Sequence, residues 1–108
     1  MQFLNDLYLG ATLASKEEEI VKKVNNNQLI PNLFFIIMST NNDNMLEFVP
    51  QWEVMQKAYP KEELRIIGFS NGKKEAVSLL QLIIQESMKN TGSADVRMYL
   101  EQKWEEQL

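Results

Sequence analysis

Two short apolar runs constrain the fold of this chain more than any other feature. Residues 33–38 read LFFIIM, and residues 64–69 read LRIIGF. An unbroken run of aromatic and β-branched residues is typical of a strand that is buried on both faces. The segment between the two runs is long enough to form a crossover. The sequence therefore predicts a right-handed βαβ unit in which the two strands are parallel.

The segment between the runs contains a conflict. Apolar residues recur at helical spacing from Met45 to Tyr59, which favours a helix. Pro50 lies inside this range, and a proline within a helix removes a hydrogen bond and clashes with the preceding turn. Two alternatives remain open: the helix kinks at Pro50, or a loose turn precedes a helix that begins there.

Helix signals also lie on either side of this unit. Ser15 and Glu18 form a capping-box pattern, which predicts a helix from about Lys16 to the asparagines at 25–27. A longer helical pattern covers residues 73–90 and ends before a glycine. Its apolar residues cover more than one face, which is typical of a helix buried in a core or in an interface.

The C-terminal segment supports two interpretations. Ser93 and Asp95 are suited to begin a last helix, whereas residues 95–100 alternate between apolar and polar side chains, as a strand does. We favour the helix. Because two strands alone make a marginal sheet, a further strand is expected from residues 3–9, from residues 95–100 or from a second copy of the chain.

These patterns together predict a single α/β domain over residues 1–108. The chain length suits one domain, and the hydrophobic content of 44% is near the globular average. The expected architecture is a small parallel sheet built on the right-handed βαβ unit and flanked by helices, with an N-terminal and a C-terminal helix.

Charge and missing residue types exclude several functions. The formal net charge is −4, and the basic residues occur as short pairs beside carboxylates, so neither nucleic acid nor a membrane surface is an expected partner. The chain has no cysteine and no histidine. Their absence removes disulfides, thiolate metal sites and the usual general base. We predict no metal and no cofactor.

The sequence also predicts a cytoplasmic location. It has no apolar run of ~18 residues that could span a bilayer. The N-terminus carries Asp6 in place of the positive start of a secretory signal.

One motif raises the question of catalysis. Residues 68–72 read GFSNG and match G-x-S-x-G, the turn that presents a nucleophilic serine in many hydrolases. Ser70 and Lys73 also have the S-x-x-K spacing of serine–lysine enzymes. However, no histidine can act as base, and Lys73 lies in a polar stretch where it stays protonated. We predict no catalytic residue, and a serine–lysine hydrolase is the least favoured function.

A purely structural role also explains the residues at 68–72. Gly68 lets the backbone pass close to a neighbour, Ser70 or Asn71 caps the following helix, and Gly72 eases the turn. These are routine uses of such residues in caps and turns.

Ligand binding without chemistry is the intermediate hypothesis. In an open parallel sheet, ligands bind outside the carboxyl ends of the strands. There two polar turns would meet two helix N-termini, which suits a small anionic ligand. The predicted ligand-binding residues are Ser39, Thr40, Asn41, Asp43, Ser70, Asn71, Gly72 and Lys73.

Four stretches carry a family resemblance: DLYLG, NMLEF, LRIIGFSNGKKEAVSLLQ and TGSADVRMYL. Together they resemble a group of small proteins from gut Firmicutes bacteria that carry no assigned function. The resemblance covers most of the chain and implies a cytoplasmic bacterial protein. It implies no activity, ligand or catalytic residue.

The function predicted from the sequence is that of a non-catalytic interaction protein. A small domain leaves much apolar surface exposed, so we expect a homo-oligomer that associates through an apolar helix or a sheet edge. The alternative is a protein that binds a small anionic ligand at the turn Ser70–Lys74.

Overall fold

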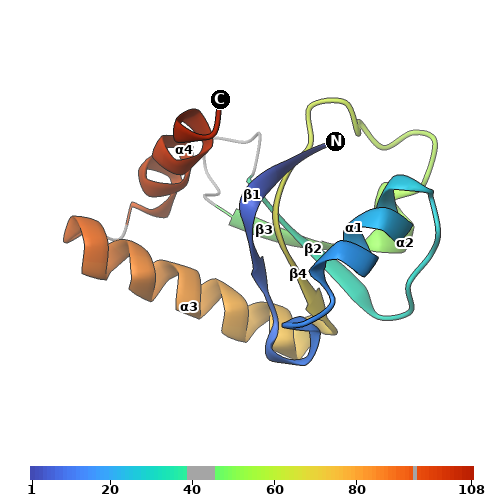
Figure 1. The fold of residues 1–108 in the computed structure, drawn as a ribbon, viewed down its shortest axis with the longest axis horizontal. Coiled ribbons are helices and arrows are strands. Elements are labelled where there is room, and N and C mark those ends of the chain that lie inside the picture. The colour runs from blue at the N-terminus through green and yellow to red at the C-terminus, as the bar shows by residue number, and fades with distance from the viewer. Residues whose placement is uncertain (39–45, 94) are drawn as a thin grey trace.

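A sheet with the strand order β1-β4-β2-β3 runs through the middle of the molecule, with helices on both faces (Figure 1). The computed structural model describes residues 1–38, 46–93 and 95–108. Within these ranges the strands are β1 (Gln2–Leu9), β2 (Leu33–Met38), β3 (Leu46–Pro50) and β4 (Arg65–Asn71). The helices are the short 3₁₀ turn η1 (Ala11–Leu13), α1 (Glu17–Asn25), α2 (Gln51–Val54), α3 (Lys73–Thr91) and α4 (Val96–Glu106).

The sheet separates two apolar cores. Phe35 of β2 belongs to a buried cluster with Val24 of α1 on one face. Ile36, the next residue, belongs to a second cluster with Ile83 of α3 and Leu100 of α4 on the other face. Successive residues of a strand point to opposite faces, so β2 fills both cores. The prediction of a strand buried on both faces is confirmed.

The prediction of a small parallel sheet built on a right-handed βαβ unit is wrong. β2 is antiparallel to β4, with Leu33 opposite Asn71 and Ile37 opposite Ile66. The reason is that the chain returns after β2 as β3, which is also antiparallel to β2. The crossover through α2 therefore joins β3 to β4, and these two strands lie on either side of β2. The coarser expectation of an α/β domain is confirmed, with a mixed sheet.

Pro50 decides the structure of the segment between the apolar runs. It is the last residue of β3 and the N-cap of α2, with extended backbone angles. Proline lacks the N–H that a helix running through it from Met45 would need, so residues 46–50 form a strand. The helix that follows extends only over Gln51–Val54. The alternative of a helix kinked at Pro50 is therefore wrong. The alternative of a helix that begins at Pro50 is closer, but a strand precedes that helix in place of a loose turn, and the helix ends well before Tyr59.

β1 supplies the further strand that the sequence requires. It pairs in parallel with β4, and the register shifts between Phe3 and Tyr8. This irregularity explains why the segment carries only a weak strand pattern. The alternative source, residues 95–100, belongs to α4, so the preference for a helix there is confirmed.

The remaining helices agree with their predicted positions. α3 ends at Gly92, whose φ of 73° is in the left-handed region that glycine tolerates. α4 begins after Asp95, whose side chain accepts a hydrogen bond from the backbone N of Met98. α1 is present, but its N-cap is Lys16 without a side-chain capping bond, so the capping box at Ser15 is not formed. Within the described ranges, no helix has the length and apolar content needed to cross a membrane.

Candidate functional site

The carboxyl ends of β2 and β4 do not share one rim of the sheet. Four of the predicted ligand-binding residues lie outside the described residues: Ser39, Thr40, Asn41 and Asp43. They follow the carboxyl end of β2, whereas Asn71 at the carboxyl end of β4 lies opposite Leu33 at the start of β2. Because the strands are antiparallel, their carboxyl ends lie at opposite ends of the sheet. The expectation of a shared rim is wrong.

The turn from β4 into α3 is closed by its own hydrogen bonds. Ser70 is fully buried, and its hydroxyl Oγ donates to the carbonyl oxygen of Gly72 at 3.3 Å. The backbone N of Asn71 donates to Oε1 of Glu75 at 3.0 Å. Gly72 has a φ of 85°, and it is the N-cap of α3, with no side-chain capping bond. A carboxylate from the first turn of the helix thus replaces the predicted cap by Ser70 or Asn71, and Lys73 is exposed.

Gly68 has the structural role that the sequence predicts. A Cβ atom at this position would overlap the carbonyl oxygen of Tyr8 on the neighbouring strand. The glycine therefore permits the close parallel approach of β1 and β4. The first glycine of the G-x-S-x-G motif is explained by packing, without any catalytic function.

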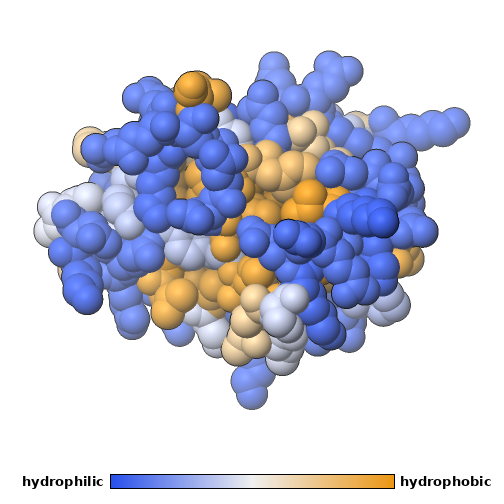
Figure 2. Space-filling view, in the orientation of Figure 1, coloured by the Kyte–Doolittle hydropathy of each residue, from blue (hydrophilic) through white to orange (hydrophobic). Residues whose placement is uncertain are grey.

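A groove lies beside this turn, where α3 meets the end of β1. It has a volume of about 570 Å³, within the range of ligand pockets. At one end of the groove, the hydroxyl of Thr12 donates a hydrogen bond to Oε2 of Glu75 at 2.8 Å. Figure 2 shows apolar atoms gathered along this seam, at the lower side of the view. The residues that line the groove are Leu9, Gly10, Ala11, Asn71, Lys74, Glu75, Ser78, Leu79 and Leu82.

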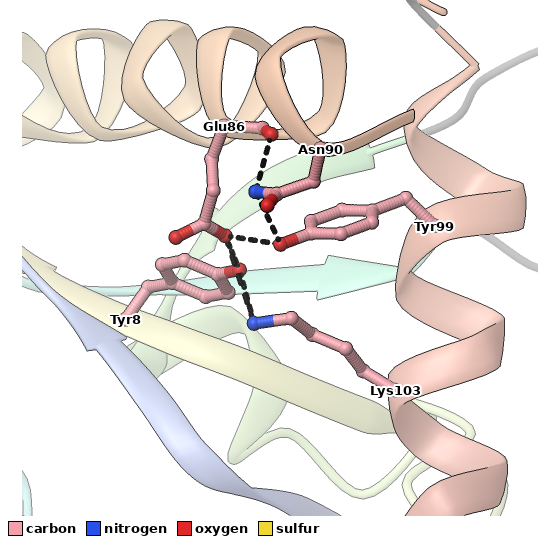
Figure 3. Close-up of polar contacts among 5 residues, drawn as sticks. All are labelled: Tyr8, Glu86, Asn90, Tyr99 and Lys103. Atoms are coloured by element: carbon pink, nitrogen blue, oxygen red, sulfur yellow. Dashed lines mark hydrogen bonds and ion pairs between the residues drawn. The ribbon is translucent and has the colours of Figure 1, made fainter. Parts of the chain in front are cut away.

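A second polar site joins β1, α3 and α4, and Figure 3 shows its five residues. Glu86 of α3 is at the centre, and its Oε2 accepts hydrogen bonds from the hydroxyls of Tyr8 and Tyr99, the latter at 3.0 Å. The ammonium Nζ of Lys103 lies 3.6 Å from the same oxygen and donates to the Tyr8 hydroxyl at 3.1 Å. Asn90 donates to the Tyr99 hydroxyl at 3.3 Å. We call Tyr8, Glu86, Tyr99 and Lys103 the tyrosine–lysine cluster.

The ammonium of this cluster also lies close to two aromatic rings. Nζ of Lys103 is 5.2 Å from the ring centroid of Tyr8 and 5.2 Å from that of Tyr99. Its 3.1 Å hydrogen bond to the Tyr8 hydroxyl places it at the hydroxyl edge of that ring, not over the face. The side chain of Lys103 is 30% exposed. The lysine is thus held by the Tyr8 hydroxyl and the Glu86 carboxylate, while part of its side chain remains open to water.

The environment fixes the protonation of this cluster. Burial and the hydrogen bond to Glu86 raise the pKa of Tyr8 far above its ordinary value. Burial would also raise the pKa of Glu86, but hydrogen bonds from the two tyrosines and the charge of Lys103 outweigh it and lower that pKa. Near neutral pH, Tyr8 therefore stays protonated and Glu86 stays ionised. General acid–base catalysis needs a pKa near the working pH, so neither group is suited to it.

The sequence analysis did not identify this cluster. Each helix carries a partial signal, because Glu86 and Asn90 are four residues apart, as are Tyr99 and Lys103, which places each pair on one face of its helix. The meeting of these faces with Tyr8 depends on how α3, α4 and β1 pack, and no local pattern encodes that packing.

Among the described residues, no group of three or more aspartate or glutamate side chains is arranged to hold a metal ion. Comparisons of the chain with family models, with curated proteins and with solved structures find no match. The function is therefore argued from the geometry of these surfaces.

Proposed function

We propose that this chain is a non-catalytic protein that acts by associating with a second copy of itself. The contact surface is the outer flank, which we define as Val77, Leu80, Ile84 and Met88 of α3 together with strand β3. The observation that carries the proposal is a contrast between the two edges of the sheet. At one edge Gln107, the residue after α4, binds the backbone of β1, whereas the other edge is regular and lies beside exposed apolar side chains.

The α3 part of the outer flank is an apolar stripe. Val77, Ile84 and Met88 are 41%, 38% and 51% exposed, and Leu80 is partly buried at the rim of the α3–α4 core. Spacings of three and four residues place them along one side of the helix. At 3.6 residues per turn, this side lies about half a turn from the glutamates that contact η1 and β1. The stripe is therefore on the side of α3 that faces away from β1.

Aromatic residues of the sheet extend this apolar surface. Phe34 of β2 and Phe48 of β3 are only partly buried at the rim of the same core. Their ring centroids are 6.0 Å apart, with the planes at 60°. Large apolar patches at the surface of a protein mark interaction sites. The outer flank combines such a patch with a strand edge.

The two sheet edges differ in how far they are protected. At β1 the register shifts between Phe3 and Tyr8, and the side chain of Gln107 binds the backbone of Phe3 and Asn5. β3 instead keeps an unbroken register with β2, from Pro50 opposite Phe34 onward, and has no bulge, although its five residues include Glu47 and end at Pro50. Proteins block edges that must stay unpaired with bulges and charges. The edge of β3 lacks the bulge that interrupts β1, so its regular backbone can still pair with another strand.

A second copy is the partner that this edge suits best. An antiparallel strand that pairs with its own copy places the same surface on both subunits, which gives a closed two-fold dimer. The sheet would continue through the two β3 strands, and each α3 stripe would be covered by the other subunit. We propose the cytoplasm as the location of this dimer, on the sequence argument given above.

Light scattering over a range of protein concentrations tests the proposal. The wild-type chain is expected to have the mass of a dimer, and Ile84→Glu is expected to have the mass of a monomer because it places a charge on the outer flank. The matched control is Leu82→Glu on the same helix, since Leu82 is 55% exposed but lines the groove. A wild-type chain that is monomeric at all concentrations would contradict the proposal.

The anionic-ligand hypothesis retains one supporting observation. Asn71 and Lys74 of the predicted turn line the groove between α3 and β1. Against it, the carboxylate of Glu75 already accepts the amide hydrogen of Asn71 at this helix start, where an anion would bind. A panel of phosphorylated and carboxylated metabolites tests it through thermal stability. The buried hydroxyl of Ser70 leaves the serine–lysine hydrolase with less support still.

A further inference from the structure

One wall of the groove between α3 and β1 carries polar side chains that the protein itself does not use. Lys74 and Ser78 are four residues apart on α3, and Asn71 precedes the helix. No hydrogen bond or ion pair joins the side chains of these three residues to any other described residue. An ammonium, an amide and a hydroxyl are therefore available together along the groove.

The rest of the groove is mainly apolar. Leu79 and Leu82 of α3 line it together with Leu9 of β1. Leu79 is buried, whereas Leu82 is 55% exposed, so apolar surface continues from the floor of the groove to its far end. Lys74 and Leu82 are eight residues apart, which is about 12 Å along the helix axis at 1.5 Å per residue. The groove thus has a positive charge at one end and a leucine at the other.

The carboxylate of Glu75, which also lines the groove, is already bound. Its Oε1 accepts the amide hydrogen of Asn71 at 3.0 Å, and its Oε2 accepts the hydroxyl hydrogen of Thr12 at 2.8 Å. In the described chain it forms no ion pair with Lys74, whose charge therefore remains available to an anion from solution. A phosphate is usually held by several backbone N–H groups or arginines. One lysine and one amide side chain suit a carboxylate better.

We propose that this groove binds a straight-chain carboxylic acid of medium length, such as octanoate. The carboxylate of the ligand lies against Lys74 and Asn71, and its chain lies along the leucines of the groove. A volume of about 570 Å³ is sufficient for such a molecule. The site rests on the anionic-ligand hypothesis given above, for which it names the ligand class, and it is independent of the proposed dimer.

Calorimetric titration with octanoate below its micelle concentration tests this site, together with the NMR shifts of the backbone amides along α3. Wild-type protein is expected to bind octanoate with a Kd of about 1 mM. Hexanoate should bind about tenfold more weakly, because two fewer CH₂ groups are buried. Octylamine, which has the same chain length and the opposite charge, should bind about fivefold more weakly or worse, because it lacks the ion pair with Lys74.

Two lysine variants separate the site from a general charge effect. Lys74→Glu should weaken octanoate binding about fivefold or more, since a repulsion replaces an attraction. Lys73→Glu is the matched control and should bind as the wild type does, because Lys73 is exposed but does not line the groove. Ile84→Glu, the variant that disrupts the outer flank, should also bind octanoate normally, so failure of the dimer would leave this result unchanged.

Three results would overturn the inference. The first is that octanoate produces no saturable shift of the amides along α3 in wild-type protein. The second is that octylamine binds as tightly as octanoate does. The third is that Lys74→Glu and Lys73→Glu bind octanoate equally well.

Discussion

The side chain of Gln107 binds the backbone of Asn5 across the outer edge of β1. Its Oε1 accepts a hydrogen bond from the Asn5 amide at 2.7 Å, and its Nε2 donates to the carbonyl oxygen of Phe3 at 3.1 Å. One amide side chain thus forms two hydrogen bonds with the backbone of β1, as a neighbouring strand would. The C-terminal end of α4 thereby protects one side of the sheet, and β3 on the other side lacks the bulge that interrupts β1.

Gln107→Ala should expose this edge and lower the free energy of unfolding by about 1 kcal/mol, because it removes two hydrogen bonds to the backbone of β1. Urea denaturation measures the loss, and hydrogen exchange at the Asn5 amide should become faster. Gln102→Ala is the control, since Gln102 lies on the same helix and is exposed. Equal stability of the two variants would show that Gln107 does not support β1.

Alkaline pH should destabilise the protein through Tyr8. The pKa of Tyr8 is raised in the folded state. The contribution of Tyr8 to the free energy of unfolding is therefore complete below the pKa of the unfolded chain, about 10, and is lost as pH rises above it. Tyr59 also has a raised pKa, so the decline should become shallower in Tyr8→Phe without vanishing. Urea denaturation between pH 8 and about 11 checks this. An unchanged slope in Tyr8→Phe would contradict the assignment.

Acidic pH should act through Glu86. The pKa of this carboxyl is lowered in the folded state. Its contribution to the free energy of unfolding is therefore present above the pKa of the unfolded chain, about 4.3, and is lost as pH falls below that value. Glu86→Gln should be less stable than the wild type at neutral pH, and the difference should shrink as pH falls below about 4. Thermal melts at several pH values measure it. A difference that stays constant with pH would show that the charge of Glu86 is not involved.

Gly68→Ala should cost about 3 kcal/mol of stability, the upper part of the range for overpacking. The added Cβ would overlap the backbone carbonyl of Tyr8, which cannot move without separating β1 from β4. Gly10→Ala is the matched control, because its Cβ would meet the flexible carboxylate of Glu75, which can turn away. Urea denaturation of both variants tests this, and a smaller loss for Gly68→Ala than for Gly10→Ala would contradict it.

The elements that the sequence predicts well are those with strong local patterns. The apolar run at 33–38 predicts a strand buried on both faces, and residues 73–90 predict α3 almost to the residue. The terminating glycine of α3 and the helix after Asp95 follow from local chemistry as well. In these segments the side chains favour the local structure that the fold also requires. Local preference and tertiary packing therefore do not conflict.

The direction of the strands could not be predicted because it depends on the segment around Pro50. The spacing of apolar residues from Met45 onward favours a helix, but the strand β3 forms there because it completes pairing with β2. Once β3 returns antiparallel, β4 also runs antiparallel to β2. One short segment thus decides the topology, and with it which turns share a rim.

The candidate sites depend on tertiary packing in the same way. The tyrosine–lysine cluster joins residues from β1, α3 and α4, and the sequence offers only pairs at helical spacing. The expectation of an apolar, partner-binding α3 does follow from the sequence, since its apolar residues cover more than one face. The sequence does not show which side of α3 stays exposed. The structure shows it, because Tyr8 of β1 and Thr12 of η1 bind glutamates on the opposite side of the helix.

Protection of single thiols tests the outer flank most directly, because the chain has no cysteine of its own. Ile84→Cys places one thiol on the outer flank, and Leu82→Cys places one on the groove side of the same helix. As protein concentration rises, the reaction of the Ile84→Cys thiol with a thiol reagent should become at least about tenfold slower, as expected for a site buried in a closed dimer. The Leu82→Cys thiol should react at a constant rate. Equal rates for both thiols at every concentration, or protection of Leu82→Cys alone, would contradict association through the outer flank.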